Sequence, residues 1–137
     1  MKKILLASAF VSCTVLGILL DIAPIHVSEE IDKICHFTGF SIITALAIVT
    51  FLAFFGRKSI NSFLLFLLTF GGIFAGFTEI LQRFITARSC CVEDWIVNLC
   101  GITVVSIFAF LFHSKREKEI RLHEERLDFK DFPVIFL

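Results

Sequence analysis

Long stretches without charged side chains divide this chain of 137 residues into four apolar segments. Asp, Glu, Lys and Arg are absent from residues 4–20, 34–56, 59–78 and 95–114. A helix rises about 1.5 Å per residue, so about 20 apolar residues cross the roughly 30 Å hydrocarbon core of a bilayer. The pattern therefore predicts an all-α fold, a four-helix transmembrane bundle with short loops and with helices at about 4–22, 28–55, 60–86 and 93–113.

Composition supports this interpretation over a soluble protein with buried helices. Hydrophobic residues make up 57% of the chain and the mean hydropathy is +0.89, both above the values typical of soluble domains. We expect one transmembrane domain over residues 1–113. Residues 114–137 carry charges of both signs and are expected to form a charged cytoplasmic tail that contains a short separate helix.

The basic residues are distributed unevenly over the predicted topology. Of the 13 basic residues, 10 lie on the same side of the predicted membrane. Positive charge near helix ends marks the cytoplasmic side of a membrane protein. Both termini are therefore predicted to be cytoplasmic, and the basic residues are explained without nucleic acid as a partner. The ten are Lys2, Lys3, Arg57, Lys58, Lys115, Arg116, Lys118, Arg121, Arg126 and Lys130.

Polar side chains gather at the opposite, extracytoplasmic ends of the second, third and fourth helices. A charged side chain costs roughly 2.5–3.5 kcal/mol at the centre of a spanning helix, so such groups need a structural or chemical reason. Since three helices present polar groups at a similar depth, we expect one pocket. Its predicted ligand-binding residues are Asp32, Lys33, His36, Glu79, Gln82, Arg88, Asp94 and Asn98.

Helical spacing links several of these residues to packing positions. Asp32 and His36 are four residues apart and share a helix face, as do Asp94 and Asn98. Gly72 and Gly76 form a small-xxx-small pattern, which permits close helix contact. That contact is equally compatible with packing inside one chain and with an oligomer.

Two short patterns resemble the signatures of the VanZ-like family of small membrane proteins. The first is Asp32-Lys33-x-x-His36-Phe37-x-x-Phe40, and the second is Glu79-x-x-Gln82 followed by Arg88, Asp94, Asn98 and Gly101. The resemblance covers roughly residues 31–107. It implies a multi-pass protein of the bacterial cytoplasmic membrane, linked to the cell envelope and to susceptibility to glycopeptides such as teicoplanin. It does not imply a reaction.

Three functions are favoured for the polar residues over a fourth, transport or proton relay, because the cytoplasmic half shows no second polar site. In the first, Lys33, Arg83 and Arg88 bind the phosphate of an anionic lipid or lipid-linked cell-wall intermediate, while Gln82 and Asn98 hydrogen-bond the headgroup. In the second, an enzyme acts on such a lipid, with His36, Glu79 and Asp94 as candidate catalytic residues. In the third, ion pairs such as Lys33–Glu79 or Arg88–Asp94 only hold the helices together.

Neither a metal ion nor another cofactor is expected. A metal held by His36, Glu79 and Asp94 is disfavoured because these residues come from three helices without a paired ligand spacing. The cysteines show no metal-binding pattern, and Cys13, Cys35 and Cys100 are expected to be small apolar packing residues. Cys90 and Cys91 are adjacent, and a strained disulfide between them or a bond to Cys35 is left open.

Overall fold

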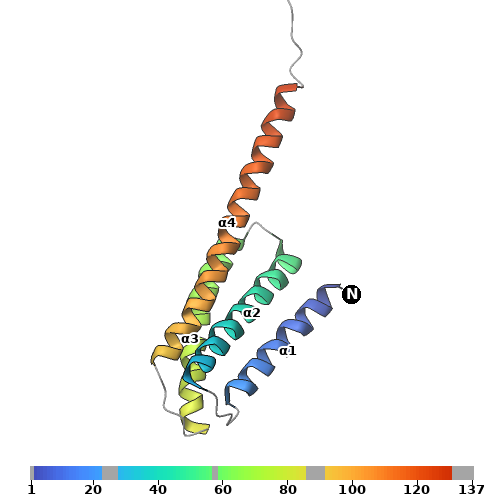
Figure 1. The fold of residues 1–137 in the computed structure, drawn as a ribbon. Coiled ribbons are helices and arrows are strands. Elements are labelled where there is room, and N and C mark those ends of the chain that lie inside the picture. Colours follow the sequence, from blue (N-terminus) through green and yellow to red (C-terminus); the bar gives the residue numbers. More distant parts are fainter. Residues whose placement is uncertain (1, 23–27, 57–58, 86–91, 131–137) are drawn as a thin grey trace, which may run out of the picture.

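The computed structural model describes residues 2–22, 28–56, 59–85 and 92–130, and these residues form helices without any strand (Figure 1). The helices are α1 (Lys2–Ile22), α2 (Glu29–Phe55), α3 (Ile60–Ile85) and α4 (Val92–Lys130). The predicted all-α fold of four helices is therefore confirmed. Every helix boundary except the end of α4 lies within two residues of its predicted position.

The fourth helix is much longer than expected. It was predicted to end near residue 113, but α4 continues without a break to Lys130 and is 39 residues long. In Figure 1 its last turns extend alone beyond the other helices. The cause is local: residues 102–130 contain neither Gly nor Pro, and the charged part is rich in Lys, Glu, Arg and Leu, which favour helix. The end of an apolar segment was mistaken for the end of a helix.

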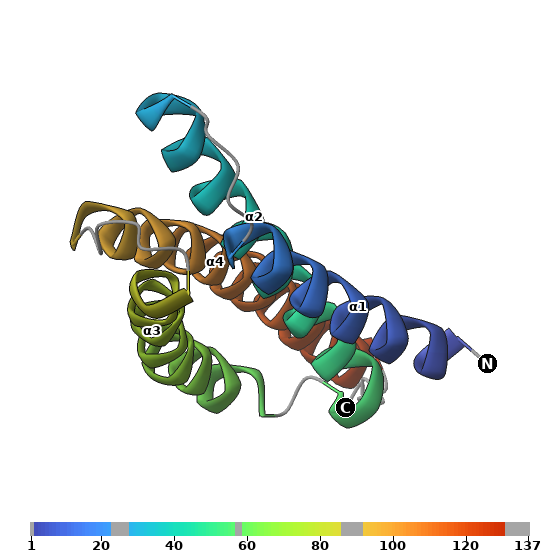
Figure 2. The same ribbon diagram turned by 90° about the horizontal axis from the view of Figure 1, so that it is seen from below.

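Helix α4 lies in the middle of the bundle, with α2 on one side and α3 on the other (Figure 2). Helix α1 lies against α2 and touches α3 less extensively, while α2 and α3 barely contact each other. The contacts of α4 with its two neighbours therefore hold the bundle together.

Glycine allows α2 and α4 to approach each other closely. A Cβ atom on Gly101 of α4 would lie 2.7 Å from the backbone oxygen of Phe37 and 3.0 Å from Ser41 Oγ, both on α2. The backbone oxygen cannot move aside as a flexible side chain could. Only glycine therefore fits at this crossing.

The glycines of α3 are used in a contact with α4. A Cβ on Gly72 would lie 3.0 Å from Leu99 Cδ2, and one on Gly76 would lie 3.3 Å from Trp95 Nε1. The Trp95 indole N–H also donates a hydrogen bond of 3.0 Å to the carbonyl oxygen of Gly72. The small-xxx-small pattern thus makes an internal helix contact, and an oligomer through the same glycines stays a prediction.

The distribution of side chains differs from that in a soluble bundle. Polar residues such as His36, Glu79 and Asn98 are buried, whereas large apolar residues such as Leu5 and Phe84 are exposed. Each of the four helices is long and apolar enough to cross a membrane. An apolar exterior around an interior that contains polar side chains is suited to a nonpolar solvent.

Replacing Gly101 with alanine should destabilise the bundle. We expect Gly101→Ala to lower the free energy of unfolding by about 1–3 kcal/mol, because the new methyl group forces α2 and α4 apart. Thermal unfolding in detergent, followed by circular dichroism, measures the change. Gly39→Ala is the matched control, since a Cβ at Gly39 meets nothing within 4 Å. Equal stability of the two variants would contradict the close crossing.

Candidate functional site

The polar side chains of three helices meet at one end of the bundle. The first turns of α2, the last turns of α3 and the first turns of α4 lie together there, opposite the N-terminus and the charged extension of α4 (Figure 1). At the start of α2 the Asp32 N–H donates a hydrogen bond of 3.0 Å to the carbonyl oxygen of Ser28. This first turn fixes the positions of Asp32 and Lys33.

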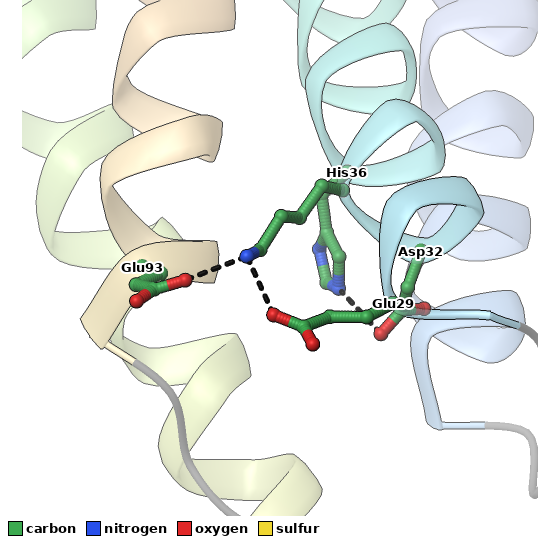
Figure 3. A network of polar contacts seen from close by, with 5 residues as sticks. Glu29, Asp32, His36 and Glu93 are labelled. Atoms are coloured by element: carbon green, nitrogen blue, oxygen red, sulfur yellow. Dashed lines mark hydrogen bonds and ion pairs between the residues drawn. The ribbon is translucent and has the colours of Figure 1, made fainter.

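Lys33 connects α2 to α4 at the edge of this cluster, through Glu29 and Glu93, which are labelled in Figure 3. Its Nζ lies 2.7 Å from Glu29 Oε1, one turn earlier in α2, and 2.6 Å from Glu93 Oε2 in α4. The structure therefore pairs Lys33 with these two glutamates, and not with Glu79 as the structural alternative suggested. The reason is position: Glu79 is deeply buried, whereas the long Lys33 side chain extends to the exposed rim.

The centre of the cluster is a buried hydrogen-bonded pair. Glu79 of α3 is 2% exposed and Asn98 of α4 is completely buried. The Asn98 Nδ2 donates a hydrogen bond of 2.9 Å to Glu79 Oε1. On the other side His36 Nδ1 of α2 lies 3.8 Å from the same oxygen. One carboxylate oxygen thus links all three helices.

Two further carboxylates lie beside His36. Asp32 Oδ2 is 4.0 Å from His36 Nε2, a contact that Figure 3 draws along α2. Asp94 of α4 joins them: one ligand-type atom each from Asp32, His36 and Asp94 lies within 4.8 Å of the others. Both aspartates are only partly buried, so this group lies between the buried pair and the outside.

The structure brings together six of the eight predicted ligand-binding residues: Asp32, Lys33, His36, Glu79, Asp94 and Asn98. Gln82 is buried on α3, three residues after Glu79, and its side chain also takes part in an interaction. Arg83 is exposed. The roles proposed for Arg88, Cys90 and Cys91 lie outside the described residues. The convergence of the helix faces is thus observed, whereas the roles of these residues in binding or catalysis stay predictions.

Sequence reasoning did not place Glu29 and Glu93 in the cluster. Their spacing could have shown them, because Glu29 precedes Lys33 by four residues and Glu93 precedes Asp94 directly. Cys13, Cys35 and Cys100 are free, but Cys35 and Cys100 are exposed on the outer faces of their helices. Cys35 and Cys100 therefore do not pack inside the bundle, and their role as small apolar packing residues stays a prediction.

An apolar cavity of about 260 Å³ lies next to the polar cluster, deeper in the bundle. Phe40 of its wall follows His36 by one helical turn, and Ile102 follows Asn98 by one turn. All four helices contribute to the wall. The lining residues are Phe10, Thr14, Phe40, Ile43, Thr44, Ala47, Leu67, Phe70, Gly71, Phe74 and Ile102.

Comparison with known proteins gives a relative without a known activity. The chain is 29% identical over 121 residues to the uncharacterized protein C11E3.10 of Schizosaccharomyces pombe, and the match covers 88% of this chain and 71% of the relative. No family model and no solved structure matches the chain. Membership of the VanZ-like family therefore stays a prediction from the sequence.

Removing the Asn98 amide should weaken the bundle. Asn98→Ala leaves the buried Glu79 carboxylate without this donor, so we expect a loss of about 1.5–3 kcal/mol in the free energy of unfolding. The measurement is thermal unfolding in detergent. Asn61→Ala is the matched control because Asn61 is an exposed residue at the start of α3. If both variants unfolded at the wild-type temperature, the hydrogen bond between Asn98 and Glu79 would have no structural importance.

Proposed function

We propose that this protein spans a membrane and binds a phosphate-bearing lipid, whose headgroup lies at the polar cluster and whose acyl chain enters the apolar cavity. The observation that carries the proposal is the position of the cavity, whose wall begins one helical turn from the cluster at Phe40 and Ile102. A polar cluster beside an apolar space fits a molecule with a polar head and an apolar tail.

Insertion in a membrane is supported by the length and surface of the helices. All four can cross a bilayer, and their outer faces carry exposed Leu, Ile, Val and Phe side chains. The basic residues that mark the cytoplasmic side occur at the N-terminus and in the extension of α4. The polar cluster would then face the extracytoplasmic side, with both termini in the cytoplasm.

An acyl chain is the occupant best suited to the cavity. The lining is almost entirely apolar and includes the phenylalanines Phe10, Phe40, Phe70 and Phe74. Its volume of about 260 Å³ is close to the lower end of ligand pockets in proteins, about 300 Å³. Lipid chains surround a transmembrane bundle at high concentration, so a lateral entry needs no aqueous path.

A phosphate group can interact with Lys33 at the edge of the polar cluster. An ammonium group has three N–H donors, and Glu29 and Glu93 accept two of them. The third is then available to a phosphate oxygen. Arg83 and Arg88, suggested by the sequence, would add positive charge. Asn98 is completely buried and bonded to Glu79, so in this proposal it positions Glu79 instead of touching the headgroup.

The proposal defines the lipid by its chemistry. A lipid-linked cell-wall intermediate has the required phosphate and chain, and the VanZ-like resemblance favours it. The similarity to a fungal protein gives no support to a bacterial envelope role. A location in the bacterial cytoplasmic membrane and an effect on glycopeptide susceptibility therefore stay predictions from the sequence.

Filling the cavity should prevent lipid binding. Ala47 is buried in the cavity wall, so Ala47→Phe places a ring where the acyl chain would lie. We expect at least a tenfold loss of retained lipid in native mass spectrometry of the detergent-extracted protein, with phosphatidic acid as the probe. Ala45→Phe is the matched control, since Ala45 is exposed on the same helix. Equal lipid retention by the wild type and by Ala47→Phe, with both folded, would rule out the cavity as the lipid site.

A second variant tests the contact with the lipid headgroup. Lys33→Gln should reduce the preference for phosphatidic acid over uncharged diacylglycerol in the same measurement, because the N–H donors of a positive ammonium group are lost.

A further inference from the structure

We propose that Asp32, His36 and Asp94 bind a divalent transition-metal ion of the first row, such as Zn²⁺ or Mn²⁺. This site goes beyond lipid binding and does not depend on it. The expectation that the protein has no metal site considered His36, Glu79 and Asp94 on three separate helices. In the structure Asp32, four residues from His36 on α2, supplies the paired ligand that this set lacked.

The three ligand groups are near enough to bind one ion after a small rearrangement. Zinc lies about 2.0–2.2 Å from nitrogen and oxygen ligands in tetrahedral geometry, so two ligands of one ion are about 3.3–3.6 Å apart. The three ligand atoms lie within 4.8 Å of one another. Closing the set takes side-chain movements of about 1–1.5 Å by the same geometry, and both aspartates are partly exposed. The ion would replace some of the other interactions that Asp32 and His36 make.

The orientation of His36 fits a metal ligand. Its Nε2 faces Asp32 at 4.0 Å, and its Nδ1 faces the Glu79 carboxylate at 3.8 Å. Histidines that bind metals usually direct their second nitrogen to a carboxylate or carbonyl, which fixes the ring and its proton. Glu79 is in turn held by Asn98. The Glu79 carboxylate thus lies on the side of His36 opposite the proposed ion, and a shift of under about 1 Å would bring it within hydrogen-bond distance of Nδ1.

Asn98 gives a separate indication of a bound group. Its Oδ1 is fully buried and accepts no hydrogen bond from any described residue, although its Nδ2 is bonded to Glu79. Asn98 follows Asp94 by one turn on the same face of α4. A buried acceptor without a donor calls for an unseen partner. A water molecule bound to the proposed ion would provide the donor.

The ligand types indicate the class of metal. Imidazole suits zinc, iron and copper, while carboxylates also accept manganese. Three protein ligands leave at least one position open. If the lipid proposal is also correct, a phosphate oxygen could occupy that position, and the ion would offset the negative charge of the surrounding carboxylates.

Metal titration tests the site without any lipid. The full chain is purified in detergent, stripped with EDTA and titrated with Zn²⁺ in an isothermal calorimeter. We expect one ion per chain for the wild type and for Glu30→Gln, which removes an exposed acid at the same end of α2. His36→Asn and Asp94→Asn should each weaken the affinity at least tenfold. Glu79→Gln should keep the stoichiometry and weaken affinity about 10–100-fold.

The visible absorption spectrum of bound Co²⁺ provides a second readout, which should change in His36→Asn when the nitrogen ligand is lost. Circular dichroism confirms that each variant is folded. Because Asp94 is partly exposed, Asp94→Asn is the substitution expected to disturb the fold least. The absence of saturable one-to-one binding by the wild type would overturn the proposal. So would unchanged affinity in Asp94→Asn.

Discussion

The organisation of this protein depends on one buried carboxylate. Glu79 is 2% exposed, and an ionisable group is removed from water only where other polar groups replace its hydration. Asn98 provides a hydrogen bond from α4, and His36 lies against the same oxygen from α2. These contacts fix the relative positions of three helices at one end of the bundle. The partly exposed Asp32, Asp94 and Lys33 surround this buried centre.

The polar network and the glycine contacts depend on each other. Gly101 lets α2 approach α4, and Gly72 and Gly76 accommodate the α4 side chains Leu99 and Trp95. Without these close approaches, side chains as short as Asn98 could not reach across to the neighbouring helix. Holding helices together and holding a ligand are therefore compatible roles for the same residues.

Much of the fold was predictable because each helix carries its own signal in hydropathy. The meeting of Asp32, His36, Glu79 and Asp94 also followed from their common depth in the predicted topology. The ion-pair partners of Lys33 could not be predicted in this way. Side-chain length and burial determine whether Lys33 pairs with Glu79 or with Glu93. The length of α4 could not be read from hydropathy, because helix propensity continues where apolar character ends. The cavity depends on how the four helices are arranged relative to one another, so it could not be predicted from the sequence of any single segment.

Helix α4 is one long continuous helix that is expected to be stiff. The helix crosses α2 at Gly101 and continues to Lys130 without a glycine or proline at which it could bend easily. The arm from the crossing to Lys130 is about 43 Å long at about 1.5 Å per residue. A tilt of about 5° at the crossing therefore displaces the far end by about 4 Å by the same geometry. A given change in the tilt of α4 would therefore displace its charged end further than its polar end.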